Sequence, residues 1–224
     1  MNEDPNLPVV ILVAAALGPL RDHFMLVGGC AVGLLMTDPA RPPVRQTIDV
    51  DLVAEVTSLR EYHSLRPDLI AAGFKEDSSA EHICRWRKDK LIVDVMPMTD
   101  VMGHSVNRWY EPAMNTAWTA RLPNGEAMKV ISAPLFIATK FEAFNDRGNG
   151  DYLHHDMEDI LNIVDGREEL PNEINDAPTD VQEFVRNEID ECLAEEDFVN
   201  QLTWMFPTGR SEVVIRRLRK IAGL

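Results

Sequence analysis

The stretch "GGCAVGLLMTDPARPPVRQTIDVDL", Gly28 to Leu52, leads from two glycines after an apolar segment to two aspartates one residue apart. We expect "TIDVDLV" (47–53) to form a strand, because polar and apolar residues alternate along it. Alternate side chains of a strand share a face, so the carboxylates of Asp49 and Asp51 would lie about 7 Å apart on one face. The residues that we expect to point into the core from this strand are Ile48, Val50 and Leu52.

Two carboxylates so placed repel each other and raise each other's pKa. A divalent cation removes this penalty, and Mg²⁺ is usually held by a few carboxylates together with phosphate oxygens and water. Glycine lets the backbone approach a phosphate closely at Gly28 and Gly29, and the helix expected at 30–36 offers unpaired N–H groups at its start. Asp94 in "LIVDVMP" provides a third carboxylate on a neighbouring apolar strand, where an unpaired charge is costly to bury. Three carboxylates around metal ions indicate phosphoryl or nucleotidyl transfer.

The pattern of the whole chain predicts a mixed first half and a helical second half. The elements expected in the first half are helices at 8–20, 30–36 and 58–72, strands at 23–27 and 47–53, and hairpins at 82–97 and 116–131. The helices expected in the second half are at 134–145, 152–165, 179–193, 196–204 and 211–222. We therefore expect an α+β protein. A small mixed β-sheet flanked by helices would occupy residues 1–132, and an all-helical domain in residues 133–224 would close the active-site cleft.

Composition limits the class of protein. Among its 224 residues no apolar run approaches the ~18 residues of a membrane span, and the start lacks the basic residues of a signal peptide, so we expect a cytoplasmic protein. Its three cysteines are scattered and indicate neither a disulfide framework nor a metal motif. The formal net charge of −15 disfavours nucleic acid unless positive charge is concentrated locally. The C-terminal "RSEVVIRRLRK" is such a concentration, which is either a solvated basic face or a surface for a polyanion.

A family resemblance follows from these motifs. Gly28-Gly29, then Asp49 and Asp51 between apolar residues, then Asp94 on a later strand resemble the signature of the nucleotidyltransferase (polymerase-beta-like) superfamily. The stretch "SAPLFIATKFEAFNDRGNGDYLHHDMEDILNIVDGR" (132–167) resembles the AbiEii-type nucleotidyltransferases. These are known as toxins of toxin–antitoxin and abortive-infection systems, and they include enzymes that add nucleotides to tRNA.

The resemblance implies a role for each matching residue. The expected metal ligands, for Mg²⁺ or Mn²⁺, are Asp49, Asp51 and Asp94. The resemblance places Gly28, Gly29, Lys140 and Asp156 at the nucleotide, and Arg45 and Thr47 are further candidates because they lie just before the aspartate strand. Asp94 would also act as a base toward the acceptor hydroxyl, and Lys140 would be a catalytic cation that neutralises phosphate charge while Asp156 orients it. Many superfamily members have Gly-Ser where this chain has Gly29-Cys30, so backbone N–H groups would replace a serine hydroxyl.

Simpler structural interpretations stay open for most of these residues. The Asp-x-Asp pair can belong to a solvated sheet edge, and Arg45 and Thr47 can pack a loop. Lys140 can extend from an amphipathic helix into solvent. Asp156 and Asp159 can be charges at a helix N-terminus, where they favour the helix dipole, and the His154-His155 pair is more typical of a surface than of a ligand set.

We therefore expect a metal-dependent enzyme that transfers NMP from an NTP to an acceptor hydroxyl and releases pyrophosphate. The resemblance implies an RNA acceptor, a tRNA 3′ end, and a toxin that a partner antitoxin neutralises. Two alternatives remain. One is a small-molecule nucleotidyltransferase of the aminoglycoside type, whose polycationic substrates an acidic cleft would suit, and the other is a non-catalytic binding module. The sequence identifies neither the NTP, the acceptor nor the oligomeric state.

Overall fold

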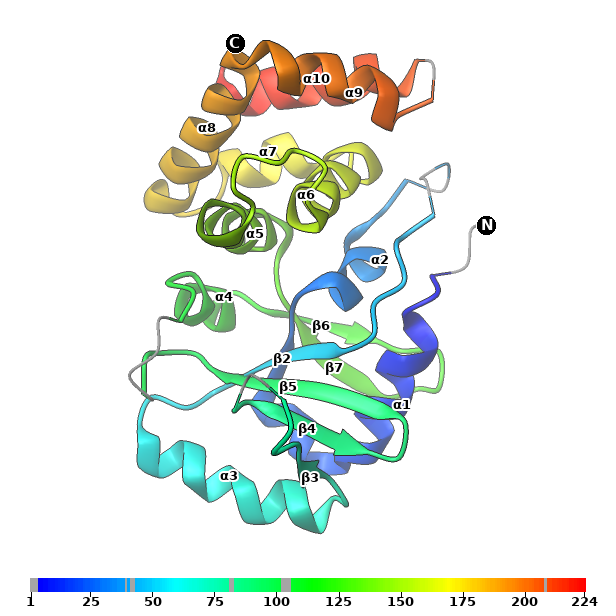
Figure 1. The fold of residues 1–224 in the computed structure, drawn as a ribbon, viewed down its shortest axis with the longest axis vertical. Coiled ribbons are helices and arrows are strands. Elements are labelled where there is room, and N and C mark those ends of the chain that lie inside the picture. The colour runs from blue at the N-terminus through cyan, green and yellow to red at the C-terminus, as the bar shows by residue number, and fades with distance from the viewer. Residues whose placement is uncertain (1–3, 39, 41–42, 81–82, 102–105, 208) are drawn as a thin grey trace. The chain divides into compact units, whose positions relative to one another are not determined.

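The computed structural model describes residues 4–38, 40, 43–80, 83–101, 106–207 and 209–224 (Figure 1). The chain divides into two compact units. The first, here called the sheet unit, comprises Glu3–Leu34 and Val44–Ser132. The second, the helical unit, comprises Met1–Asn2, Leu35–Pro43 and Ala133–Leu224.

The sheet unit is built on a seven-stranded mixed sheet, counted over the described residues, in the order β3-β4-β5-β2-β1-β7-β6. Its strands are β1 (Phe24–Leu26), β2 (Val50–Ala54), β3 (Lys75–Glu76), β4 (Arg85–Lys88), β5 (Leu91–Pro97), β6 (Trp118–Arg121) and β7 (Ala127–Val130). The pairs β2–β5 and β1–β7 are parallel, and the other neighbours are antiparallel. Both expected hairpins form, β4–β5 and β6–β7; His82, at the start of the first, lies outside the described residues.

Strand β2 lies at the centre of the sheet because its apolar side chains are buried. Val50 and Leu52 are fully buried, as expected. Ile48 is not: it is 82% exposed, so the prediction that it points into the core was wrong. The reason is that the strand begins at Val50, and both Ile48 and Asp49 lie in the bend before it.

The sheet unit also carries helices α1 (Leu7–Leu17), α2 (Val32–Leu35, whose last residue belongs to the helical unit), α3 (Leu59–Ala71) and α4 (Tyr110–Asn115), with 3₁₀ turns η1 (Gly18–His23) and η2 (Gly29–Ala31). Helix α1 was expected to reach residue 20. It ends at Leu17 because Gly18 takes a positive φ of 56°. Helix α3 begins after Ser58, whose hydroxyl accepts a hydrogen bond from the Glu61 N–H.

From Ala133 onward the described residues form helices and no strand. They are α5 (Ala133–Arg147), α6 (His155–Gly166), α7 (Leu170–Asn175), α8 (Thr179–Ala194), α9 (Glu196–Met205) and α10 (Arg210–Ala222). The α+β class with a mixed sheet and a helical C-terminal part is thus confirmed. No helix among the described residues is both long enough and apolar enough to span a bilayer.

Candidate active site

Asp51 and Asp94 lie side by side on the parallel strands β2 and β5, where they are register partners. Register partners point to the same face, so their carboxylates share one side of the sheet. Gly28, after the end of β1, lies against this pair. A Cβ built on Gly28 would come within 2.0 Å of the Asp51 Oδ2 atom, so only glycine allows the backbone to lie this close to the carboxylate.

Asp49 joins the pair through an arginine that the sequence analysis missed. Arg85 on β4 is the register partner of Asp94. Its Nε donates to Asp94 Oδ1 at 2.8 Å, and its Nη2 donates to Asp94 Oδ2 and to Asp49 Oδ2, each at 2.7 Å. The hydrogen bonds to Asp94 raise the pKa of Arg85 above its ordinary value. The structure therefore pairs Asp51 with Asp94 on neighbouring strands and links Asp49 to Asp94 through Arg85.

The glycine turn is fixed by the residues that precede β2. A Cβ on Gly29 would lie 2.4 Å from Thr47 Cγ2 and 3.6 Å from Arg45 Nη2, so both predicted residues lie over this glycine. The hydroxyl of Thr47 donates to the carbonyl oxygen of Asp49 at 3.1 Å. Thr47 thus holds the bend that carries Asp49, and it does so beside the turn expected to approach phosphate.

Cys30 directly follows the two glycines and contacts the residues of the Asp49 bend. Its Sγ lies 3.0 Å from Thr47 Oγ1 and donates to the Asp49 carbonyl oxygen at 3.3 Å. Burial raises the pKa of Cys30 to about 12, so its thiol stays protonated at neutral pH. The thiol therefore supports the Asp49 bend.

The residues present fit a hard divalent cation. Asp49, Asp51 and Asp94 offer carboxylate oxygens only, which is the donor set that Mg²⁺ and Mn²⁺ prefer. The Asp94 side chain is nearly buried, so its charge needs a compensating cation. The guanidinium of Arg85 between Asp49 and Asp94 shows that this position attracts positive charge.

Lys140 lies in a separate ionic network inside the helical unit. Its Nζ on α5 is 2.9 Å from Asp156 Oδ1 and 2.7 Å from Asp159 Oδ2, both on α6. Arg147 also donates to both oxygens of Asp156, at 2.7 and 2.9 Å. The side chain of Lys140 is buried, so the structure places it among these carboxylates. Asp156 and Asp159 lie three residues apart on α6, so both carboxylates face Lys140.

The pKa values of this network follow from burial and charge together. Burial alone would lower the pKa of Lys140, but Asp159 and Asp156 outweigh it and raise the pKa above its ordinary value. Burial would likewise raise the pKa of Asp156, but the hydrogen bonds and charges of Arg147 and Lys140 hold it well below the ordinary range. Both groups are therefore charged at neutral pH.

Comparisons with known proteins support the fold assignment but do not identify the activity. No protein-family model matches the chain, and no curated protein matches it. Among solved structures, an antigenic nucleotidyltransferase-like protein from Paracoccidioides brasiliensis matches 88% of this chain and 93% of its own, with a TM-score of 0.51 and 20% sequence identity. This chain therefore has a nucleotidyltransferase-like fold.

Two structures of ANT(2'')-Ia match less closely. The complex with adenylyl-2''-tobramycin covers 70% of this chain and 87% of its own, with a TM-score of 0.45 and 13% identity. The solution structure of this antibiotic-resistance factor covers 88% and 99%, with a TM-score of 0.49 and 14% identity. Neither match adds to the fold assignment, and the narrower AbiEii-type resemblance stays a prediction.

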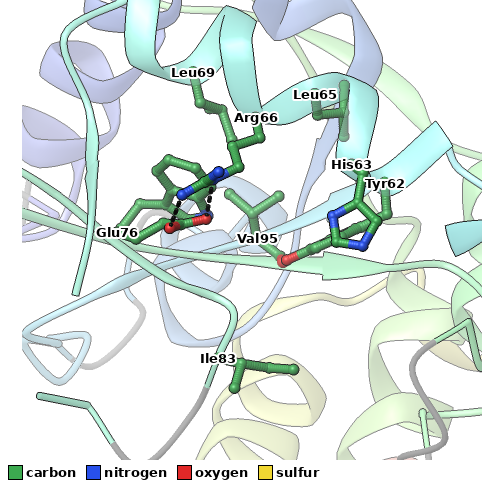
Figure 2. A pocket seen from close by; sticks show the side chains of 9 residues that line it. Tyr62, His63, Leu65, Arg66, Leu69, Glu76, Ile83 and Val95 are labelled. Carbon is green, nitrogen blue, oxygen red and sulfur yellow. Dashed lines mark hydrogen bonds and ion pairs between the residues drawn. The ribbon is translucent and has the colours of Figure 1, made fainter. Parts of the chain in front are cut away.

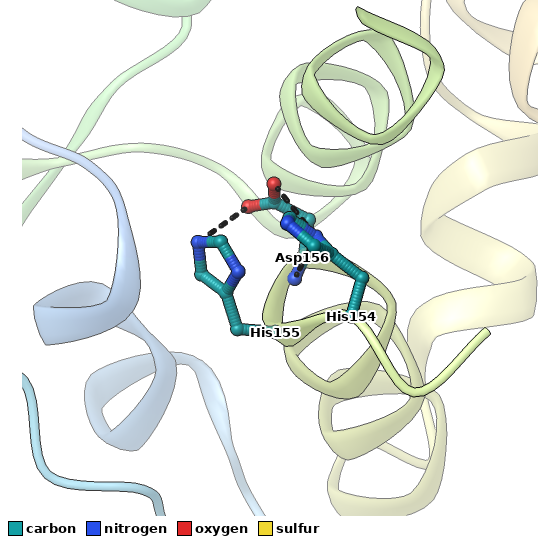
Figure 3. Close-up of side chains that lie close together, drawn as sticks. All are labelled: His154, His155 and Asp156. Atoms are coloured by element: carbon teal, nitrogen blue, oxygen red, sulfur yellow. Dashed lines mark hydrogen bonds and ion pairs between the residues drawn. The ribbon is translucent and has the colours of Figure 1, made fainter. Parts of the chain in front are cut away.

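A second group of possible metal ligands lies in the helical unit of this nucleotidyltransferase-like fold. One ligand atom each from His154, His155 and Asp156 lies within 4.8 Å of the others (Figure 3). However, His154 Nδ1 already accepts a hydrogen bond from the Asp156 N–H at 3.3 Å and so caps α6. Both oxygens of Asp156 already contact cationic side chains. A dication would have to displace cationic side chains at either group, Lys140 and Arg147 here and Arg85 at the carboxylates of the sheet unit.

The sheet unit also contains a pocket of about 180 Å³ beside α3 (Figure 2). It is mostly apolar, and an ion pair between Arg66 and Glu76, 2.7 Å between Nε and Oε1, lies at one end. Val95 lines it, and Val95 follows Asp94 on β5, so its side chain points to the opposite face of the sheet. The pocket is therefore separate from the three carboxylates.

Proposed function

We propose that this protein is a nucleotidyltransferase that moves a nucleoside monophosphate from an NTP to an acceptor hydroxyl and depends on Mg²⁺ or Mn²⁺. The observation that carries the proposal is the placement of Asp51 beside Asp94 and Gly28, with Asp49 linked to Asp94 through Arg85, on a nucleotidyltransferase-like fold. Fold alone hosts many functions, so the argument depends on this site.

The residues divide the chemistry among them. Asp49, Asp51 and Asp94 would hold the cation, which when bound supplies charge neutralisation and lowers the pKa of the attacking hydroxyl. Asp94, the most buried of the three, would accept the proton from that hydroxyl. The backbone of Gly28 and Gly29 would contact the triphosphate, because a side chain at either position would fill the approach.

Lys140, which belongs to the helical unit, would bind a phosphate group of the nucleotide. An ammonium group has three N–H donors, and the contacts to Asp156 and Asp159 use two of them. We assign the third to a phosphate oxygen and give Asp156 the role of orienting Lys140. The domain prediction, with residues 133–224 closing the cleft over residues 1–132, belongs to the same proposal.

RNA is the acceptor that we favour, with a tRNA 3′ end as the specific candidate, in a toxin that a partner antitoxin neutralises. This part depends on the AbiEii-type resemblance and on the exposed basic residues of α10. Those residues are Arg216, Arg219 and Lys220. The second candidate is an aminoglycoside-type acceptor, which the net charge of −15 favours because a polycation is attracted to an acidic protein.

Label transfer distinguishes these acceptors. The protein is incubated with Mg²⁺ and each α-³²P-labelled NTP, with total cellular RNA in one arm and an aminoglycoside panel in the other. We expect labelled RNA, and no label with Asp51→Asn. Asp89→Asn, which removes a carboxylate from the exposed turn between β4 and β5, is the matched control and should retain activity. Label on the aminoglycoside alone would select the second candidate, and no label in either arm would support a non-catalytic module.

A further inference from the structure

We infer that Arg85 is a built-in cation of the carboxylate site. Its guanidinium neutralises Asp49 and Asp94 in the metal-free protein, and a divalent metal must displace it to bind. The inference rests on the proposed metal site, and it assigns a role to a residue that neither the motifs nor the fold comparison identifies. Its consequence is that Arg85 lowers the affinity of the site for metal and stabilises the protein before metal arrives.

The contacts of Arg85 place one nitrogen atom between two of the proposed ligands. Nη2 lies 2.7 Å from Asp49 Oδ2 and 2.7 Å from Asp94 Oδ2, while Nε holds the other oxygen of Asp94 at 2.8 Å. A planar guanidinium matches carboxylate geometry and makes strong charge-assisted hydrogen bonds. The side chain is 23% exposed, so solvent reaches the contact and exchange with a dissolved ion is possible.

A metal and this nitrogen cannot use the same oxygens together. Mg²⁺ binds carboxylate oxygens at about 2.0–2.1 Å. An ion that bridges Asp49 and Asp94 would therefore stand where Nη2 stands, and its charge would repel the guanidinium. The Nη2 contacts must break, whereas the Nε contact to Asp94 Oδ1 is free to persist and would keep Arg85 beside the loaded site.

The neighbouring arginine shows that this placement is specific to Arg85. Arg87 is two residues further along β4, and its guanidinium pairs with Asp77 rather than with Asp49 or Asp94. Arg87→Gln therefore removes an equal charge from the same strand without touching Asp49 or Asp94, which makes it the matched control.

The test is Mn²⁺ binding to the full-length chain by isothermal titration calorimetry, together with thermal melting in EDTA. Arg85→Gln should bind Mn²⁺ about tenfold more tightly than wild type, and Arg87→Gln should bind within about twofold of wild type. In EDTA, Arg85→Gln should melt at a lower temperature, because like charges are left together, and saturating Mn²⁺ should raise its Tm more than that of wild type.

Arg85→Lys provides the same test where Arg85→Gln does not fold. A lysine keeps the charge but lacks the fork that holds two carboxylates, so its Mn²⁺ affinity should fall between those of wild type and Arg85→Gln. Equal or weaker Mn²⁺ binding by the Arg85 variants would overturn the inference and leave the metal site standing. Absence of Mn²⁺ binding in wild type and variants alike would instead refute the metal site, and the inference with it.

Discussion

Gly28 illustrates how one residue determines whether the site can form. It has φ 63° and ψ −163°, a backbone region that is essentially restricted to glycine, and it also lies against the Asp51 carboxylate. Glycine is therefore required here for two independent reasons, backbone conformation and space.

Gly28→Ala should consequently lower the free energy of unfolding by about 1–3 kcal/mol from backbone strain and also abolish nucleotide transfer, because Asp51 must move. Gly125→Ala is the control: Gly125 has φ 87° in the β6–β7 turn, but its Cβ would meet nothing within 4 Å. Thermal melts and label transfer on both variants test this. Equal activity in the two variants would show that contact with Asp51 does not matter.

Lys140 differs from surface lysines because its partners are buried. Removing it leaves the carboxylates of Asp156 and Asp159 with less compensation, and breaking such a pair typically costs about 3–5 kcal/mol. We expect Lys140→Met to destabilise the protein by about 3 kcal/mol in urea denaturation.

Lys129→Met is the matched substitution at a partly exposed pair with Glu55, where less than about 1 kcal/mol is expected. A Lys140→Met variant as stable as Lys129→Met would contradict the network described for α5 and α6.

Asp156 makes the free energy of unfolding depend on pH in the acid range. Its pKa in the folded protein lies below its ordinary value of 3.8, so the unfolded chain binds the proton more readily. The resulting stability is fully present above that ordinary value and is lost as the pH falls below it. Urea denaturation from pH 6 to pH 3 should show a steeper loss for wild type than for Asp156→Asn. Parallel curves would show that Asp156 is not the titrating group.

At the scale of elements, α6 is held at its C-terminal end by arginines from α10. Arg217 donates from Nη1 to the carbonyl oxygens of Val164 and Asp165, and Arg210 donates to Asp165 as well. These carbonyls have no partner within the helix, so cationic donors satisfy them and complement the helix dipole.

Arg217→Gln should therefore lower the Tm, with a loss of about 1–3 kcal/mol, because buried carbonyls lose a charged donor. Arg216→Gln, at the exposed neighbouring position of α10, should stay within about 0.5 kcal/mol of wild type. Circular dichroism melts of the two variants make the comparison. Similar melting of both would argue that α10 does not cap α6.

Periodicity predicted the long elements but not how strands are paired or where each begins. The alternation around Val50 predicted β2, but not that Asp49 would lie in a bend, because Cys30, which is distant in sequence, fixes that bend together with a local hydrogen bond from Thr47. Arg85 was missed since its partner depends on the register of the β4–β5 hairpin. Helices α4 and α7 were missed because six residues contain too few turns to show a helical period.

For the whole molecule, the sequence predicted the fold class because both halves carry strong periodic patterns, and the carboxylate signature predicted a candidate site. The sequence did not predict that the guanidinium of Arg85 forms hydrogen bonds with Asp49 and Asp94. The acceptor is likewise undetermined by the fold, and a net charge of −15 limits an RNA acceptor to local basic surfaces.

The central claim is that Asp49, Asp51 and Asp94 hold a divalent cation. Crystals soaked in Mn²⁺ and measured for anomalous scattering test it most directly, because the ion is located without reference to activity. We expect an anomalous peak about 2.1 Å from oxygens of these carboxylates, with Nη2 of Arg85 withdrawn from Asp49. A peak at His154, His155 and Asp156 instead, or none at saturating Mn²⁺, would contradict it.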